Sequence, residues 1–76
     1  MTFKILDTVV VSTGLPAHGL KRGDVGAVVQ VYSASTVEVE FVRASGHTQA
    51  VLTLGADQTR PVGPRDLLAV RQLDAA

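Results

Sequence analysis

The feature that most constrains the fold of this chain is a polar turn followed at once by two β-patterned segments. The turn is the tetrad Lys-Arg-Gly-Asp at 21–24, in which Gly23 is free to take a positive φ. The segments cover residues 25–32 and 36–43, and the Ser-Ala-Ser link at 33–35 has the length of a hairpin loop. Consecutive strands of this kind predict a small, strongly bent β-barrel.

The rest of the chain continues this pattern, which predicts five short strands in all. The loop at 13–19 contains two glycines and a proline, which break any regular element. Residues 60–65 contain two prolines and a glycine, and they predict a short turn. Short strands with short connections close most economically into a barrel. The expected strands are 7–12, 25–32, 36–43, 48–54 and 66–71.

Alternation within the strands separates an inward from an outward face. In the third strand Val37, Val39 and Phe41 point inward, while the two glutamates between them point to solvent. Gly26, at the start of the second strand, leaves room for a bulge or a close backbone crossing. The other residues expected inside are Val9, Val11, Ala27, Val29, Val31, Ala50, Leu52, Leu54, Leu68 and Val70.

Size and composition fit one domain over residues 1–76. A chain of 76 residues has no room for a second core, and 46% of its residues are hydrophobic. There is no cysteine, so neither a disulfide nor a thiolate metal site supplements the aliphatic core. Seven basic residues balance seven acidic ones. A net charge of zero argues against nucleic acid as the main partner and favours self-association.

The N-terminus and the hydropathy pattern predict a cytoplasmic protein. Residues 1–7 lack the charged start, apolar stretch and small-residue cleavage site of a signal peptide. No apolar run approaches the roughly 20 residues that a membrane-spanning helix needs. We therefore expect no contact with a membrane.

Four stretches carry a family resemblance: Leu-Asp-Thr-Val-Val at 6–10, Leu-Pro-Ala-His-Gly-Leu-Lys-Arg-Gly-Asp-Val-Gly at 15–26, Val-Glu-Val-Glu-Phe at 37–41 and Leu-Thr-Leu at 52–54. In these four stretches the chain resembles a bacterial family of small stand-alone proteins that is known only as a domain of unknown function. The strand pattern resembles an SH3-like barrel, and residues 9–30 resemble a KOW motif. The resemblance implies an accessory or antitoxin-like role beside another small protein, and no activity for any residue.

No pattern in the chain predicts catalysis or cofactor binding. His18 and His47 are the two histidines, and each falls in a glycine-containing turn without a ligand at metal-binding spacing. Glu38 and Glu40 lie about 7 Å apart on one strand face, which predicts two solvated carboxylates and no acid/base pair. We expect a protein that is not an enzyme and that holds no metal or cofactor.

The apolar residues out of phase with the expected core give the main functional signal. Both faces of so small a barrel cannot be buried, so some of these residues should form the kind of exposed apolar patch that marks protein contacts. The alternative is that bulges shift the phase and place them at the barrel ends. We expect a protein-interaction module, a homo-oligomer or a protein docked on a small partner, that uses Val28, Tyr32, Val42 and Val51. Also out of phase are Val10, Leu67 and Ala69.

The opposing hypothesis is a KOW-like nucleic-acid-binding domain that uses Lys21, Arg22 and Arg43. Aromatic side chains that could stack on bases are scarce, since only Tyr32 is expected near a sheet surface. The same scarcity argues against a polyproline-binding groove. Salt separates the two classes, because phosphate binding weakens steeply with salt while apolar docking holds. The sequence leaves open the partner, the oligomeric state and whether the loop at 13–24 binds anything.

Overall fold

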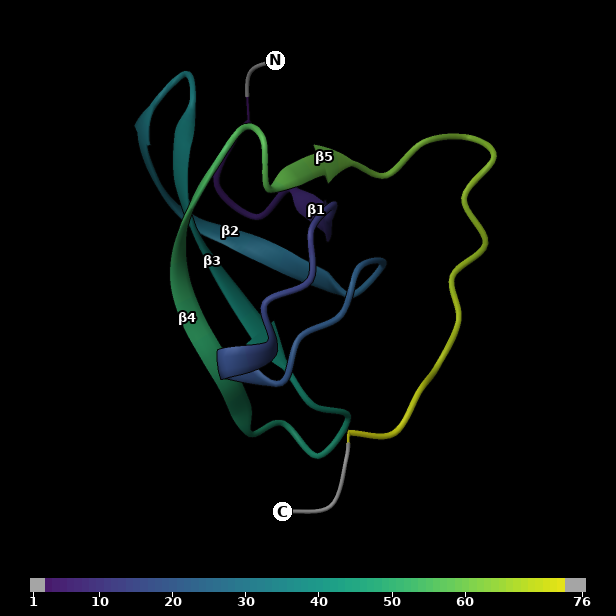
Figure 1. Ribbon diagram of the computed structural model, residues 1–76. Coiled ribbons are helices and arrows are strands. Elements are labelled where there is room, and N and C mark those ends of the chain that lie inside the picture. Colours follow the sequence, from purple (N-terminus) through teal and green to yellow (C-terminus); the bar gives the residue numbers. More distant parts are fainter. Residues whose placement is uncertain (1–2, 74–76) are drawn as a thin grey trace.

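The fold is organised around β2 (Val25–Ser33), which pairs with a different strand on each side. A computed structural model describes residues 3–73 of the protein and places five strands in one sheet of order β4-β3-β2-β1-β5 (Figure 1). A single 3₁₀ turn, η1, lies in the loop between the first two strands. The other elements are β1 (Thr8–Val11), η1 (Pro16–His18), β3 (Thr36–Val42), β4 (Thr48–Gly55) and β5 (Thr59–Pro61).

The predicted all-β class is confirmed, because every pairing in the five-stranded sheet is antiparallel. Within residues 3–73 no pairing joins β4 to β5, so the sheet is open along these two strands. The described part of the chain contains no helix of the length and apolarity that crossing a membrane requires.

A β-bulge bends β2 and changes which of its residues point inward. The register shifts between Val28 and Gln30, which makes Val29 the extra residue. The bulge places both Val28 and Val31 against the core. The expectation that Ala27 and Val29 point inward and Val28 outward is therefore wrong, because strict alternation stops at the bulge.

The core is built from aliphatic side chains and two phenylalanines. The alternation predicted for β3 is confirmed, and on β4 Leu54 is buried while Ala50 and Leu52 pack partly against the core. Val10, expected on the outer face, is also buried, at 4% exposed. The buried cluster consists of Phe3, Val9, Val11, Leu20, Val28, Val37, Val39, Phe41 and Leu54.

The last strand of the sheet lies earlier in the chain than the sequence predicts. After β4 the chain reverses in a tight turn, in which the Gln58 amide donates to the Gly55 carbonyl at 3.0 Å. The chain then pairs with β1 as β5. Residues 66–71 form no strand, and Leu68 and Val70, expected inside, are 71% and 99% exposed.

We call residues 62–73 the C-terminal arm. The arm has no helix or strand; it leaves the sheet after β5 and follows an open path along one side of the molecule (Figure 1). Its far end is tied back to the turn before β2 by an ion pair between Arg71 and Asp24. The predicted turn at 60–65 is correct only after Pro61, since the first two of these residues belong to β5.

Gly26 permits a close crossing between β2 and β3, as its position predicts. A Cβ there would lie 2.6 Å from Val39 Cγ1, 2.9 Å from the Glu40 carbonyl oxygen and 2.9 Å from Phe41 Cδ1. We expect Gly26→Ala to lower the free energy of unfolding by about 1–3 kcal/mol, measured by urea denaturation, because these atoms must move apart.

The control for this prediction is Gly14→Ala, whose Cβ would have no neighbour closer than 3.8 Å. It should change the free energy of unfolding by no more than about 0.5 kcal/mol. Equal stabilities of the two variants would contradict the close crossing at Gly26.

Candidate functional site

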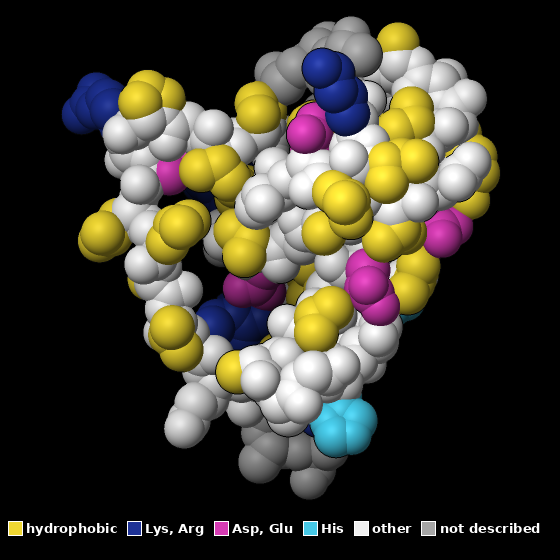
Figure 2. Space-filling model, turned by 180° about the vertical axis from the view of Figure 1, so that it is seen from behind, with side chains coloured by type: hydrophobic (Ala, Val, Ile, Leu, Met, Phe, Trp, Pro, Cys, Tyr) yellow, Lys and Arg dark blue, Asp and Glu magenta, His cyan; other side chains and the backbone are white. Residues whose placement is uncertain are grey.

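A hollow of about 680 Å³ lies between the sheet and the C-terminal arm. Figure 2 shows it from behind, as open space between the body of the molecule and the arm, along which hydrophobic side chains follow one another. The body contributes the residues Thr8, Val10, Leu20, Gly23, Asp24, Val25, Phe41, Val42, Arg43, Ala44, Gln49 and Arg60, and the arm contributes residues 66–73.

The near end of the arm is fixed by Asp66. Its carboxylate accepts hydrogen bonds from Nη1 and Nη2 of Arg60, at 2.7 and 2.8 Å, and from the Gly63 amide at 2.6 Å. The Arg60 guanidinium and the Gly63 amide together hold the pKa of Asp66 at about 2, below its ordinary value of 3.8. This anchor is therefore fully ionised at neutral pH.

The far end of the arm is fixed by Arg71. Its guanidinium donates to both carboxylate oxygens of Asp24, with Nε 2.7 Å from Oδ1, and to the Gly19 carbonyl at 2.9 Å. The Lys21 amide orients the same Asp24 carboxylate at 2.8 Å. The hydrogen bond from Arg71 lowers the pKa of Asp24, so this second anchor is also ionised at neutral pH.

Between the two anchors the arm presents apolar side chains to solvent. Leu67, Leu68 and Val70 are 90%, 71% and 99% exposed. No backbone hydrogen bond joins residues 67–70 to any other part of residues 3–73. The segment therefore offers both apolar side chains and free backbone donors and acceptors.

The wall of the hollow that belongs to the sheet is apolar as well. Val10 of β1 pairs with Val25 of β2, and Val25 and Val42 line both the hollow and a smaller depression beside it. Val25 and Val42 are about half exposed. Apolar surfaces thus face each other across open space.

The four residues predicted to contact a protein partner lie in different places. Tyr32, Val42 and Val51 are exposed on β2, β3 and β4, and of the four only Val42 lines the hollow. The Tyr32 hydroxyl donates to Glu38 Oε2 at 2.6 Å, which raises the pKa of Tyr32. The prediction that Val28 contacts a partner is wrong. Val28 is completely buried, because the β-bulge turns its side chain into the core, and it cannot touch a partner of the folded protein.

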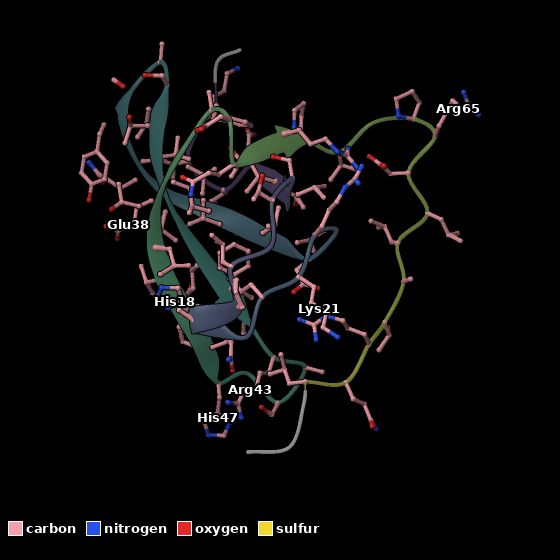
Figure 3. The ribbon with its side chains drawn as sticks, in the orientation of Figure 1. His18, Lys21, Glu38, Arg43, His47 and Arg65 are labelled. Atoms are coloured by element: carbon pink, nitrogen blue, oxygen red, sulfur yellow. The ribbon has the colours of Figure 1, made fainter. Side chains whose placement is uncertain are left out.

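The three basic residues of the nucleic-acid hypothesis come from two separate turns. Figure 3 labels Lys21 and Arg43, one from each turn. Lys21 and Arg22 belong to the turn before β2 and are exposed. Arg43 follows β3, and its Nε donates to Gln49 Oε1 at 2.9 Å. Arg43 lines the hollow, whereas Lys21 and Arg22 do not.

The two histidines are both exposed and belong to separate elements (Figure 3). His18 ends η1, while His47 precedes β4 with its Nδ1 3.0 Å from the Ser45 hydroxyl. Neither histidine lines the hollow. Among residues 3–73, no three His, Asp or Glu side chains are grouped in a way that could hold a metal ion.

Sequence reasoning missed the arm as a wall of the site. Period-two spacing assigned Leu68 and Val70 to a core strand, although Pro61 and Pro64 separate them from the sheet. A signal was present in the two opposite charges, at 66 and 71, that bracket the apolar residues. The pattern alone does not show that Asp66 pairs with the nearby Arg60 and that Arg71 pairs with the distant Asp24.

The lowered pKa of Asp66 predicts how the anchor at the near end of the arm responds to pH. Because the pKa of Asp66 is lowered from 3.8 to about 2 in the folded protein, the anchor stabilises the arm at pH values above 3.8 and is lost as the pH falls through 2. The Gly63 amide donates to this carboxylate, so its NMR chemical shift should titrate with a midpoint near 2.

Arg60→Gln is the matched variant for this titration, and it should move the midpoint upward because it removes the guanidinium. A Gly63 midpoint near 3.8 in the unaltered protein would contradict the anchored arm.

Comparison with known proteins places residues 5–61 in a family described as a domain of unknown function, DUF4926. The matched residues include all five strands and end where β5 ends, so the C-terminal arm lies beyond them. No curated protein and no solved structure gives a significant match to the chain. Since the match covers the whole sheet and most of the chain, as the sequence resemblance led us to expect, the protein belongs to the DUF4926 family.

Proposed function

We propose that the protein is a non-catalytic protein-interaction module that receives a partner in the hollow between the sheet and the C-terminal arm. The observation that carries the proposal is the exposure of Leu67, Leu68 and Val70 on a segment held by an ion pair at each end. A loose tail can expose apolar residues without consequence. An anchored segment that does so keeps them available for a partner.

The energetics favour docking at this site. Complete burial of one leucine or valine side chain stabilises a contact by about 1.5–3 kcal/mol. The two anchors hold the arm in place before the partner arrives, which lowers the conformational entropy lost on binding. Both acidic anchors are already paired with arginines, so docking need not desolvate an unpaired charge next to the apolar residues.

The free backbone of the arm indicates the kind of segment that fits. Residues 67–70 can hydrogen-bond an extended strand from a partner, while alternate side chains of that strand enter the hollow. We propose a small protein partner with an extended, apolar segment, which agrees with the accessory or antitoxin-like role implied by the family resemblance.

The finer structural identity is part of the same proposal. We propose that the bent sheet is an SH3-like barrel, supported by its five-strand order and the bulge in β2. We also propose a bacterial setting on the basis of the resemblance, and a cytoplasmic one on the basis of the N-terminal sequence and the hydropathy pattern. The KOW-like reading of residues 9–30 predicts the alternative, nucleic-acid binding through Lys21, Arg22 and Arg43.

The test is a double variant, Leu67→Ser with Val70→Ser, in a binding assay with a partner captured from the source cells. Loss of two buried apolar contacts should weaken the measured affinity about 100-fold or more, and salt should leave the unaltered complex intact. Ile5→Ser is the control, since Ile5 is 58% exposed and does not line the hollow.

Unchanged affinity of the double variant would overturn the proposed site. A complex that dissociates steeply with added salt, and that loses affinity on substitution of Lys21 and Arg22, would favour the nucleic-acid alternative.

A further inference from the structure

The two edges of the sheet are built differently. β5, at one edge, has three residues and includes Arg60 and Pro61. A short strand, a charge and a proline are the usual means by which proteins prevent a sheet edge from pairing with another chain. β4, at the other edge, has eight residues, and its sequence Thr-Gln-Ala-Val-Leu-Thr-Leu-Gly contains no charge and no proline.

The middle of β4 is open on its outer side. Within the described residues, 50–54 make backbone hydrogen bonds to β3 and to no other segment. Figure 1 shows β4 along one margin of the molecule with no strand beyond it. Ala50 and Leu52 face the core and are only partly buried, and Val51 on the opposite face is 48% exposed.

We infer that β4 pairs antiparallel with β4 of a second copy of this chain, on a two-fold axis at Val51. The dimer continues the sheet from one copy into the other. This inference concerns a surface separate from the hollow and does not depend on the proposed partner site.

A second copy fits this edge because β4 is self-complementary about Val51. In that register Val51 faces its own copy and Leu52 faces Ala50, so apolar residues meet apolar residues. Thr53 faces Gln49, and both are polar and neutral. A two-fold axis repeats each contact away from the axis, and two-fold symmetry is the commonest among soluble oligomers.

Electrostatics do not oppose the pairing. The chain has a net charge of zero. The acidic residues nearest the edge, Glu38 and Glu40, are partly exposed on the outer face of β3 and accept hydrogen bonds from the Tyr32 and Thr48 hydroxyls. The two copies of β3 are separated by three strand spacings of about 4.8 Å each. The total distance of about 14 Å is longer than the Debye length of about 8 Å, so the acidic residues of the two copies are largely screened from each other.

The test uses single cysteines, because the chain contains none of its own. In an antiparallel pair the facing Cα atoms are about 4.5–5.5 Å apart, a separation that a disulfide spans. Val51→Cys should therefore cross-link rapidly to a covalent dimer under mild oxidation. Val42→Cys, at a position of nearly equal exposure but on β3 inside the sheet, should cross-link at least about 10-fold more slowly.

A second variant tests the same contact without cysteine. Val51→Lys places an ammonium group opposite Glu40 within one copy, which the monomer tolerates, but it places two ammonium groups face to face across the two-fold axis. Light scattering should give the mass of a dimer for the unaltered protein and for Val42→Lys, and the mass of a monomer for Val51→Lys.

The inference is overturned if the unaltered protein is a monomer and Val42→Cys and Val51→Cys cross-link at equal rates. It is also overturned if Leu68→Cys cross-links faster than Val51→Cys, because the contact would then lie on the arm. Because Val42 lines the hollow and Val51 does not, loss of partner binding in Val42→Lys with retention of the dimer separates this inference from the proposed function.

Discussion

The bend of β2 is the constraint on which the rest of the structure depends. The bulge at Val29 turns Val28 and Val31 toward the core together, and Gly26 lets β2 cross close to β3. β2 can then pair with both β1 and β3 while the sheet wraps around a small aliphatic core. β5, the last strand of this wrapped sheet, leads directly into the C-terminal arm.

The arm depends on a different kind of interaction. Two arginine–aspartate pairs, one local and one between residues 47 positions apart, fix its ends. Exposed ion pairs contribute little to overall stability. Their role here is positional, since bidentate geometry fixes direction as well as distance. A positioned arm with unburied leucines makes physical sense as a recognition surface, and the free β4 edge on another side of the sheet would allow two such surfaces in one dimer.

The sequence predicted those parts of the structure in which residues close in the chain are also close in space. The β2–β3 hairpin and the inward face of β3 followed from local alternation, and they are confirmed. Val28 was misplaced because a bulge leaves no local mark in a run of valines. Residues 66–71 were assigned to a strand because Leu68 and Val70 have the right spacing, whereas the place in the sheet was already taken by β5. The anchor at the far end of the arm could not be predicted, because Asp24 and Arg71 meet only through the fold.

A preformed arm is the central claim, and backbone ¹⁵N relaxation of residues 67–70 tests it most directly. If the anchors hold the arm, these amides should have order parameters near the value of about 0.85 that is typical of rigid backbone. Asp24→Asn should lower them, since it removes the partner of Arg71. Order parameters below about 0.6 in the unaltered protein would contradict the claim, because a flexible tail exposes its leucines without presenting a binding surface.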